Sequence, residues 1–74
     1  MYLKRLKDLR EDIDEKQSTI AKFLGITRQQ YSLYETGKRD MPAEYIKELA
    51  VFYNTSTDYI LELTNDTRAY RRDI

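Results

Sequence analysis

Apolar residues divide the chain into short amphipathic segments, and the clearest pair lies in residues 17–24 and 28–36. Apolar side chains recur there at the three- and four-residue spacing of a helix. The inward positions are Ile20, Ala21, Leu24, Tyr31 and Tyr34. Gly25 lies between the segments, and glycine readily adopts the left-handed conformation that ends a helix and turns the chain. The pattern predicts two short helices joined by a tight turn.

Three further segments show helical spacing. Residues 2–14 form an amphipathic pattern that should end near Ile13, because the acids that follow are unfavourable at a helix C-terminus. Pro42 fits the first position of a fourth helix, and Asn54, which tolerates a left-handed conformation, is expected to stop it. Ser56 should cap a short fifth helix whose apolar side carries Tyr59, Ile60 and Leu63.

The third helix is specified by its own ends. Thr27 can cap the first turn, and Gln30 completes a capping box three residues later. Gly37 can supply the left-handed residue beyond an end near Thr36. A tight turn into a well-capped second helix indicates a helix-turn-helix, the motif whose second helix enters the DNA major groove.

These elements predict the fold class and the domain organisation. A chain of 74 residues forms one small domain, which buries only about 60% of its unfolded surface. We expect an all-α, compact five-helix bundle over residues 1–64. Residues 65–74 lack a helical stripe, so we expect a frayed C-terminal tail or one short helical turn there.

Composition argues against catalytic and metal chemistry. The chain has no cysteine and no histidine, so it lacks disulfides, thiolate ligands and the commonest general base. Asp12, Asp14 and Glu15 could be read as an acid cluster, but they follow an exposed helix end without an apolar pocket to shift their pKa values. We expect no enzyme activity, no cofactor and no metal site.

The N-terminal sequence and the hydropathy pattern bear on the compartment. No apolar run approaches the roughly 20 residues that cross a bilayer, and charged residues interrupt the turns after Met1 where a signal peptide would be apolar. We expect no membrane partner and a cytoplasmic location.

Charge is balanced overall but uneven along the chain. The net charge is zero, yet residues 17–39 hold four basic residues against one acid, and residues 40–63 hold one basic residue against five acids. Such a dipolar domain can present its basic side to phosphate and turn its acidic side away. Ordinary solvated charge would give the same counts, so charge alone leaves both interpretations open.

Residues 17–36 carry an ordered set of matches to one family. Its motif favours alanine at the fifth position, glycine at the ninth, and apolar residues at five others. The matching residues are Ile20, Ala21, Leu24, Gly25, Ile26, Tyr31 and Tyr34. The chain therefore resembles the phage repressor and Cro family, the xenobiotic-response-element class of bacterial regulators. The resemblance covers roughly residues 3–63, and the segment from Glu35 to Arg39 is similar to the family's Glu-x-Gly-Lys/Arg stretch.

The resemblance implies a lambda-repressor-like fold and a function. It implies a bacterial or phage-encoded transcriptional regulator, most often a repressor, whose partner is double-stranded DNA. It also implies a homodimer on a near-palindromic operator, because one domain covers only a half-site. The candidates for the dimer contact are Tyr59, Leu63 and Tyr70, although Tyr59 is equally suited to the core.

The resemblance further implies which residues read bases. They are Arg28, Gln29, Ser32 and Leu33. Arg28 can pair with guanine O6 and N7, and Gln29 can pair with adenine N6 and N7. Ser32 is short and reaches phosphate or a water. Leu33 can pack on a thymine methyl group, or it can belong to the core.

A second set is expected to contact the phosphate backbone and to position the protein without reading sequence. Gln17 begins the second helix, where the helix dipole favours a phosphate oxygen. Lys22 would act electrostatically, and Lys16 replaces the usual polar cap. The full set is Lys16, Gln17, Lys22, Thr27, Lys38 and Arg39.

Two questions remain open from the sequence. The resemblance implies a buried ion pair between Arg10 and Glu35, and the alternative is two unrelated surface charges. The neutral net charge and the acidic residues 40–63 also fit a protein-interaction module, such as an antitoxin or an anti-repressor partner. That alternative predicts no salt-dependent DNA binding and an unidentified protein partner.

Overall fold

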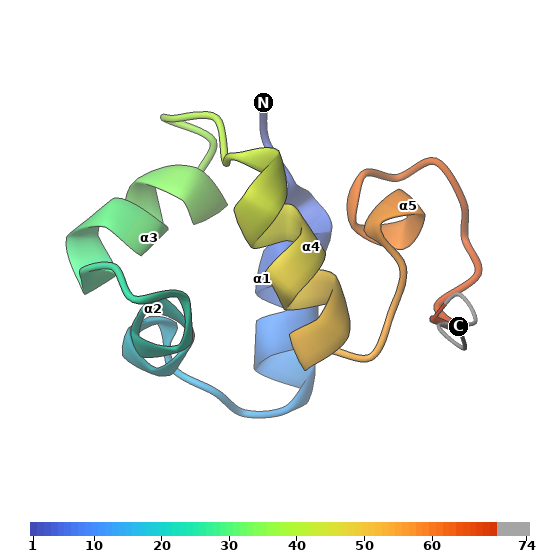
Figure 1. Ribbon diagram of the computed structural model, residues 1–74, viewed down its shortest axis with the longest axis horizontal. Coiled ribbons are helices and arrows are strands. Elements are labelled where there is room, and N and C mark those ends of the chain that lie inside the picture. The colour runs from blue at the N-terminus through green and yellow to red at the C-terminus, as the bar shows by residue number, and fades with distance from the viewer. Residues whose placement is uncertain (70–74) are drawn as a thin grey trace.

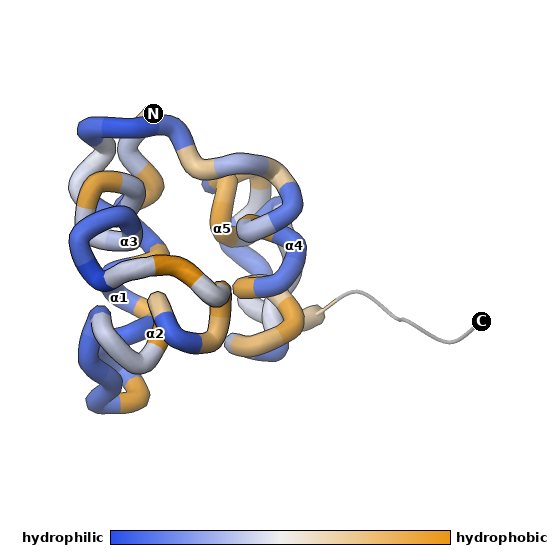
Figure 2. Tube along the Cα trace, turned by 60° about the vertical axis from the view of Figure 1, so that its left-hand side comes forward, coloured by the Kyte–Doolittle hydropathy of each residue, from blue (hydrophilic) through white to orange (hydrophobic). Residues whose placement is uncertain are grey.

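The computed structural model of the protein describes residues 1–69, and this part of the chain is all-α, as predicted. It contains five helices and no strand. Their bounds are α1 Lys4–Asp12, α2 Gln17–Leu24, α3 Arg28–Glu35, α4 Ala43–Phe52 and α5 Thr57–Ile60. Figure 2 shows apolar and polar residues alternating along these helices, which is the amphipathic pattern expected from the sequence.

The helices form two groups around α1 (Figure 1). α2 packs on α3 at one end of the molecule, and α4 packs on α5 towards the other. α1 lies in the middle and contacts both α3 and α5. This arrangement places α3 and α5 on opposite sides of the bundle, and α1 is positioned to hold both.

The core is built from the predicted stripes. Each helix contributes at least one buried apolar residue, and two further residues come from the segments before α1 and before α4. The buried apolar residues are Leu3, Leu6, Ile20, Ala21, Leu24, Tyr31, Met41, Ile46, Leu49, Ala50 and Ile60. Tyr34 is only half-buried and contacts the Tyr45 ring at the edge of the core, with 6.0 Å between ring centroids.

The predicted helix stops are present. Gly25 ends α2 with a φ of 74°, and its N–H bonds back to the carbonyls of Ala21 and Lys22. Gly37 follows α3 with a φ of 79°, and a Cβ there would lie 3.0 Å from the Tyr2 Cβ. Asn54 has a φ of 53° after α4. Glycine is therefore required at position 37 by both conformation and space.

Several element ends differ from the sequence prediction. α1 begins at Lys4 rather than at residue 2, and Pro42 is the N-cap of α4 rather than its first residue. α5 ends at Ile60, and Glu62 then turns the chain with a φ of 64°. Leu63 is for that reason outside any helix and exposed, and its expected place on the apolar side of the fifth helix is wrong.

The described part of the predicted tail, residues 65–69, lies outside any helix. The Thr67 carbonyl accepts a hydrogen bond of 2.7 Å from Thr55 Oγ1, and Asp66 binds the Arg68 side chain and backbone N–H. Within residues 1–69 no helix is long and apolar enough to cross a membrane.

Candidate DNA-binding surface

The outward face of α3 follows from which of its residues are buried. Tyr31 and Glu35, four residues apart, both point into the bundle. Among the residues expected to read bases, Arg28 and Gln29 are exposed in the first turn. Ser32 and Leu33 are half-buried one turn later, so Leu33 shares in the packing while keeping part of its surface open.

The start of α3 is fixed by a reciprocal cap. The Gln30 backbone N–H donates to Thr27 Oγ1 and the Thr27 backbone N–H donates to Gln30 Oε1, each over 3.1 Å. This is the predicted capping box. It occupies Gln30, whereas Arg28 and Gln29, which lie between the two, take no part in it.

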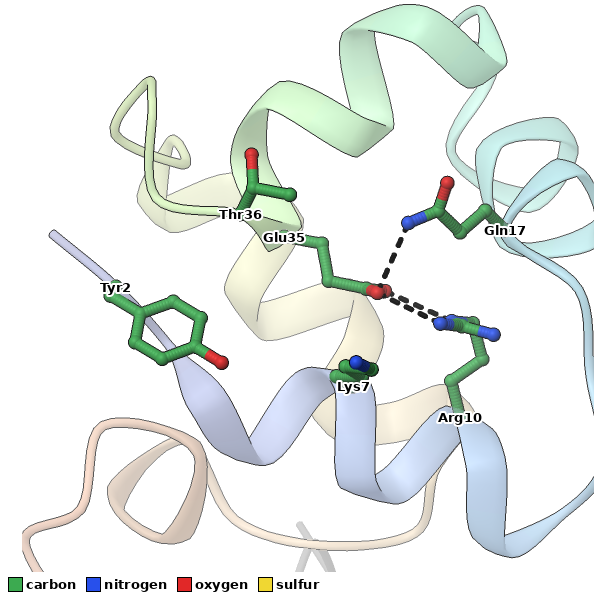
Figure 3. Close-up of a pocket in the computed structure, with 6 residues that line it drawn as sticks. All are labelled: Tyr2, Lys7, Arg10, Gln17, Glu35 and Thr36. Carbon is green, nitrogen blue, oxygen red and sulfur yellow. Dashed lines mark hydrogen bonds and ion pairs between the residues drawn. The ribbon is translucent and has the colours of Figure 1, made fainter.

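The ion pair expected between Arg10 and Glu35 is present (Figure 3). It fixes the end of α3. Arg10 Nε donates to Glu35 Oε2 over 3.0 Å, and Arg10 Nη2 donates to Oε1 over 2.9 Å. A third donor, Arg10 Nη1, binds the Glu15 carbonyl over 2.9 Å. The pair is buried, since the Glu35 side chain is only 3% exposed. One guanidinium therefore ties α1 to α3 and to the chain that enters α2.

Gln17 has a different role in the structure from the one its position suggested. Its side-chain Nε2 donates to Glu35 Oε1 over 3.1 Å, so the amide points into the bundle (Figure 3). The start of α2 carries no side-chain cap at Lys16. Backbone N–H groups at such an end remain available to an anion.

The environment of the pair keeps both partners charged. The hydrogen bond to Glu35 raises the pKa of Arg10. Burial by itself opposes ionisation of Glu35, but the hydrogen bonds it accepts and the charge of Arg10 outweigh burial and hold its pKa below the ordinary 4.5. Burial, and then the neighbouring Glu35 carboxylate, raise the pKa of Tyr31. The Tyr31 hydroxyl stays protonated beside this charge.

A surface hollow of about 460 Å³ lies next to the ion pair. It lies between the N-terminal segment, α1, the start of α2 and the end of α3 (Figure 3), and its lining residues are Tyr2, Lys7, Arg10, Gln17, Glu35 and Thr36. Sequence reasoning missed Lys7, an exposed cation at this rim. Its spacing of three residues from Arg10 on one helix was the signal that could have found it.

The other residues that were expected to contact the phosphate backbone are all exposed. They are Lys16, Lys22, Thr27, Lys38 and Arg39. Lys38 and Arg39 lie in the loop between α3 and α4, and the Arg39 N–H binds the Leu33 carbonyl over 3.1 Å. The next residue, Asp40, pairs with the Met1 ammonium group, which neutralises the acid beside the two cations.

Two of the three dimer candidates, Tyr59 and Leu63, lie in or just after α5. Tyr59 is half-buried in α5, and the Arg5 guanidinium lies over its ring, 4.2 Å from the centroid. Leu63 is 73% exposed. Tyr70 lies outside the described residues. α5 lies on the opposite side of the bundle from α3 (Figure 1).

The acidic residues 12–15 do not form a metal site in the described structure. No group of three or more histidine, cysteine, aspartate or glutamate side chains in residues 1–69 is arranged to hold a metal ion. Asp14 instead adopts a left-handed turn with a φ of 56°, and the Glu15 carbonyl is a hydrogen-bond acceptor for Arg10. The segment serves the connection between α1 and α2.

Known proteins resemble this chain over most of its length. The helix-turn-helix family model matches residues 6–60. The SPbeta prophage-derived HTH-type transcriptional regulator YonR of Bacillus subtilis is 38% identical over 65 residues, which are 88% of this chain and 60% of that protein. The transcriptional repressor RstR of the cryptic phage CTXphi in Vibrio cholerae is 31% identical over 67 residues, 90% of this chain and 58% of that protein.

A third relative, the HTH-type transcriptional regulator ImmR of Bacillus subtilis, is 38% identical over 58 residues, 78% of this chain and 46% of that protein. The chain thus spans between 46% and 60% of the length of these three relatives. The chain belongs to the helix-turn-helix family of the phage repressor and Cro type.

Proposed function

We propose that this helix-turn-helix protein binds double-stranded DNA sequence-specifically and regulates transcription, with α3 in the major groove. The observation that carries the proposal is the outward face of α3. Arg28 and Gln29 stand exposed in its first turn, while the capping box at one end and the Arg10–Glu35 pair at the other hold the helix in place. A rigid helix with free polar side chains is what base reading requires.

The proposed base contacts follow the exposure of each side chain. Arg28 pairs with guanine O6 and N7, and Gln29 pairs with adenine N6 and N7. Ser32 and Leu33 lie one turn deeper and are half-buried, so Ser32 reaches phosphate or water and the open part of Leu33 packs on a thymine methyl group. Arg28 and Gln29 carry most of the specificity.

The proposed phosphate contacts surround that helix. Exposed cations at Lys38 and Arg39 follow α3, and Lys16 precedes α2, whose uncapped N–H groups favour an anion. Thr27 and Lys22 complete the set of phosphate contacts expected from the sequence. Gln17 contributes to this set through its backbone N–H rather than its side-chain amide, which is bound to Glu35. We add Lys7 because it is exposed at the hollow beside the start of α2.

We also propose a homodimeric repressor on a near-palindromic operator in the cytoplasm of a bacterium. The dimer contact would involve Tyr59, Leu63 and Tyr70, and α5, which carries Tyr59, lies away from α3 (Figure 1). The support for repression is the family membership and the name of the CTXphi relative. Two such domains would read half-sites about one helical turn apart.

Selection from a randomised duplex library at fixed salt tests the proposal. The expected result is an enriched inverted repeat, and Arg28→Ala should weaken binding to it by about 1–3 kcal/mol while relaxing preference at one base pair. Lys47→Ala is the matched control, because it removes an exposed cation of α4 outside the proposed interface. Equal loss on selected and random duplexes would contradict base reading by Arg28.

The salt dependence of binding distinguishes the proposed phosphate contacts from the proposed base contacts. Lys38→Ala should weaken binding to selected and random duplexes alike and make the slope of log affinity against log salt shallower by about one unit. Failure to enrich any sequence, together with binding that does not depend on salt, would favour the protein-interaction module instead.

A further inference from the structure

Arg5, a second arginine of α1, binds the chain both before and after the C-terminal end of α5. Its Nη1 donates to the Tyr59 carbonyl over 2.7 Å and to the Thr64 carbonyl over 2.6 Å. Its Nη2 donates to Asn65 Oδ1 over 2.8 Å. The same guanidinium covers the Tyr59 ring. One side chain thus binds three acceptors that are 54 to 60 residues away along the chain.

These contacts hold residues 61–67, which we name the Leu63 loop, in one conformation. On one side of Leu63, Glu62 lies 3.7 Å from Lys4 Nζ, and on the other side the Thr64 carbonyl is bound by Arg5. The Leu63 N–H itself donates to the Asp58 carbonyl over 2.8 Å. The loop is therefore held at its apolar residue by the Leu63 N–H and immediately after it by Arg5.

The result of this bracing is an apolar side chain presented to solvent. Leu63, at 73%, is the most exposed of the large apolar residues in the described part of the chain. Glu62 before it takes a left-handed conformation that is unfavourable for a residue other than glycine. A single exposed leucine is ordinary, but one held by strained and braced backbone is pre-organised for contact.

The charges beside Leu63 suit a second copy of the same surface. Glu62 is paired with Lys4, and Asp66 is paired with Arg68 over 2.8 Å. Both acids of the Leu63 loop thus already have a cation within the same chain. Two identical loops can therefore face each other across a twofold axis without bringing unpaired like charges together.

We propose that Arg5 is a positioning residue for self-association: it holds the Leu63 loop in the conformation through which a second copy of this chain docks. The inference rests on the dimer of the proposed function and names the residue on which that dimer depends. Arginine is needed because its planar fork reaches two carbonyls and an amide at once, whereas a lysine ammonium keeps the charge without that geometry.

A double-mutant cycle on the full chain tests this role, with the self-association constant measured by sedimentation equilibrium. Leu63→Ala should weaken self-association about tenfold, and Arg5→Lys should weaken it by a similar factor. In the doubly substituted chain the two losses should not add, because Arg5 acts through the placement of Leu63. Val51→Ala, a truncation of another exposed apolar residue, is the matched control and should change nothing.

Two further readouts separate positioning from folding. Arg5→Lys should speed hydrogen exchange at the Leu63 amide while leaving exchange in α2 and α3 unchanged. If Arg5→Lys does not fold, Asn65→Ala removes one acceptor of Arg5 and should weaken self-association about threefold. Additive losses in the cycle, or full self-association by Arg5→Lys, would overturn the proposal.

Self-association of the wild-type chain is itself a test of the proposal. A sample that stays monomeric at all concentrations tested would overturn this inference and the proposed dimer together. Salt-dependent binding of that same sample to a short duplex would still support the DNA-binding function, so the failure of the two proposals can be told apart.

Discussion

At each end of α1 an arginine side chain ties the helix to a segment distant in sequence, but the two arginines bind different kinds of partner. Near its C-terminus, Arg10 binds a buried carboxylate, Glu35, and so fixes α3. Near its N-terminus, Arg5 binds one backbone carbonyl within α5 and one beyond it, and so fixes the Leu63 loop. A carboxylate brings a second charge that must itself be desolvated, whereas a carbonyl does not. The first junction should thus be the more sensitive to loss of a partner and to pH.

The largest effect is expected at the buried junction. Arg10→Ala should lower the free energy of unfolding by about 3–5 kcal/mol, because Glu35 would remain buried without its cation. Urea denaturation followed by circular dichroism measures this. The double substitution Arg10→Met with Glu35→Leu is the control, and it should recover much of the loss. A loss below about 1 kcal/mol for Arg10→Ala would contradict the sensitivity that we assign to this junction.

Acid should weaken the same junction selectively. The folded-state pKa of Glu35 lies below its ordinary 4.5, so the carboxylate contributes stability above that pH and loses it as pH falls through the folded-state value. The stability gap between the wild-type chain and Glu35→Gln should therefore narrow below pH 4.5. Asp66, whose pKa Arg68 lowers to about 2, is present in both chains and cancels. A stability gap that widens on acidification would contradict this prediction, because it would mean that protonation of Glu35 favours the folded state.

A smaller loss is expected at the other end of α1. Arg5→Ala should lower the free energy of unfolding by about 1–2 kcal/mol, since it removes three hydrogen bonds and the contact with the Tyr59 ring while leaving no buried charge behind. The same denaturation experiment measures it. A loss as large as that of Arg10→Ala would remove the distinction between carboxylate and carbonyl partners.

The smallest effect is expected at the exposed pair beside Arg5. Lys4 and Glu62 are 3.7 Å apart, and the Lys4 side chain is 59% exposed, so water screens the attraction. Lys4→Ala should change the free energy of unfolding by less than about 1 kcal/mol, and raising the salt concentration should shrink the difference further. Thermal unfolding at two salt concentrations measures both. A larger loss that salt does not reduce would show that Lys4 acts through packing.

The parts of the fold that were predictable are those with local causes. Gly25 and Gly37 stop helices because of their own backbone freedom, and Thr27 with Gln30 forms a cap within one turn. Helical spacing does not explain the exposure of Arg28, because it places Arg28 on the same side of α3 as the buried Tyr31 three residues later. The Arg10–Glu35 pair spans 25 residues, and only a family resemblance made it visible in the sequence.

The end of α5 was less predictable. Ile60 and Leu63 have helical spacing, but the helix stops before Leu63 because Glu62 turns the chain. The Gln17 amide was likewise placed towards DNA by its position, whereas an acceptor on another helix, Glu35, draws it inward. For Gln17, a distant contact thus decided the direction of a side chain that local spacing had left open.

By itself, the sequence determined the five helices of the described residues and the turn between α2 and α3. These depend on periodicity and on caps within a few residues. Only the tertiary structure decided what Gln17 and Arg5 bind and where Leu63 lies. The acceptors of Arg5 are mainly backbone carbonyls, which every residue carries, so no residue type in the sequence marks them and only the fold brings them within reach.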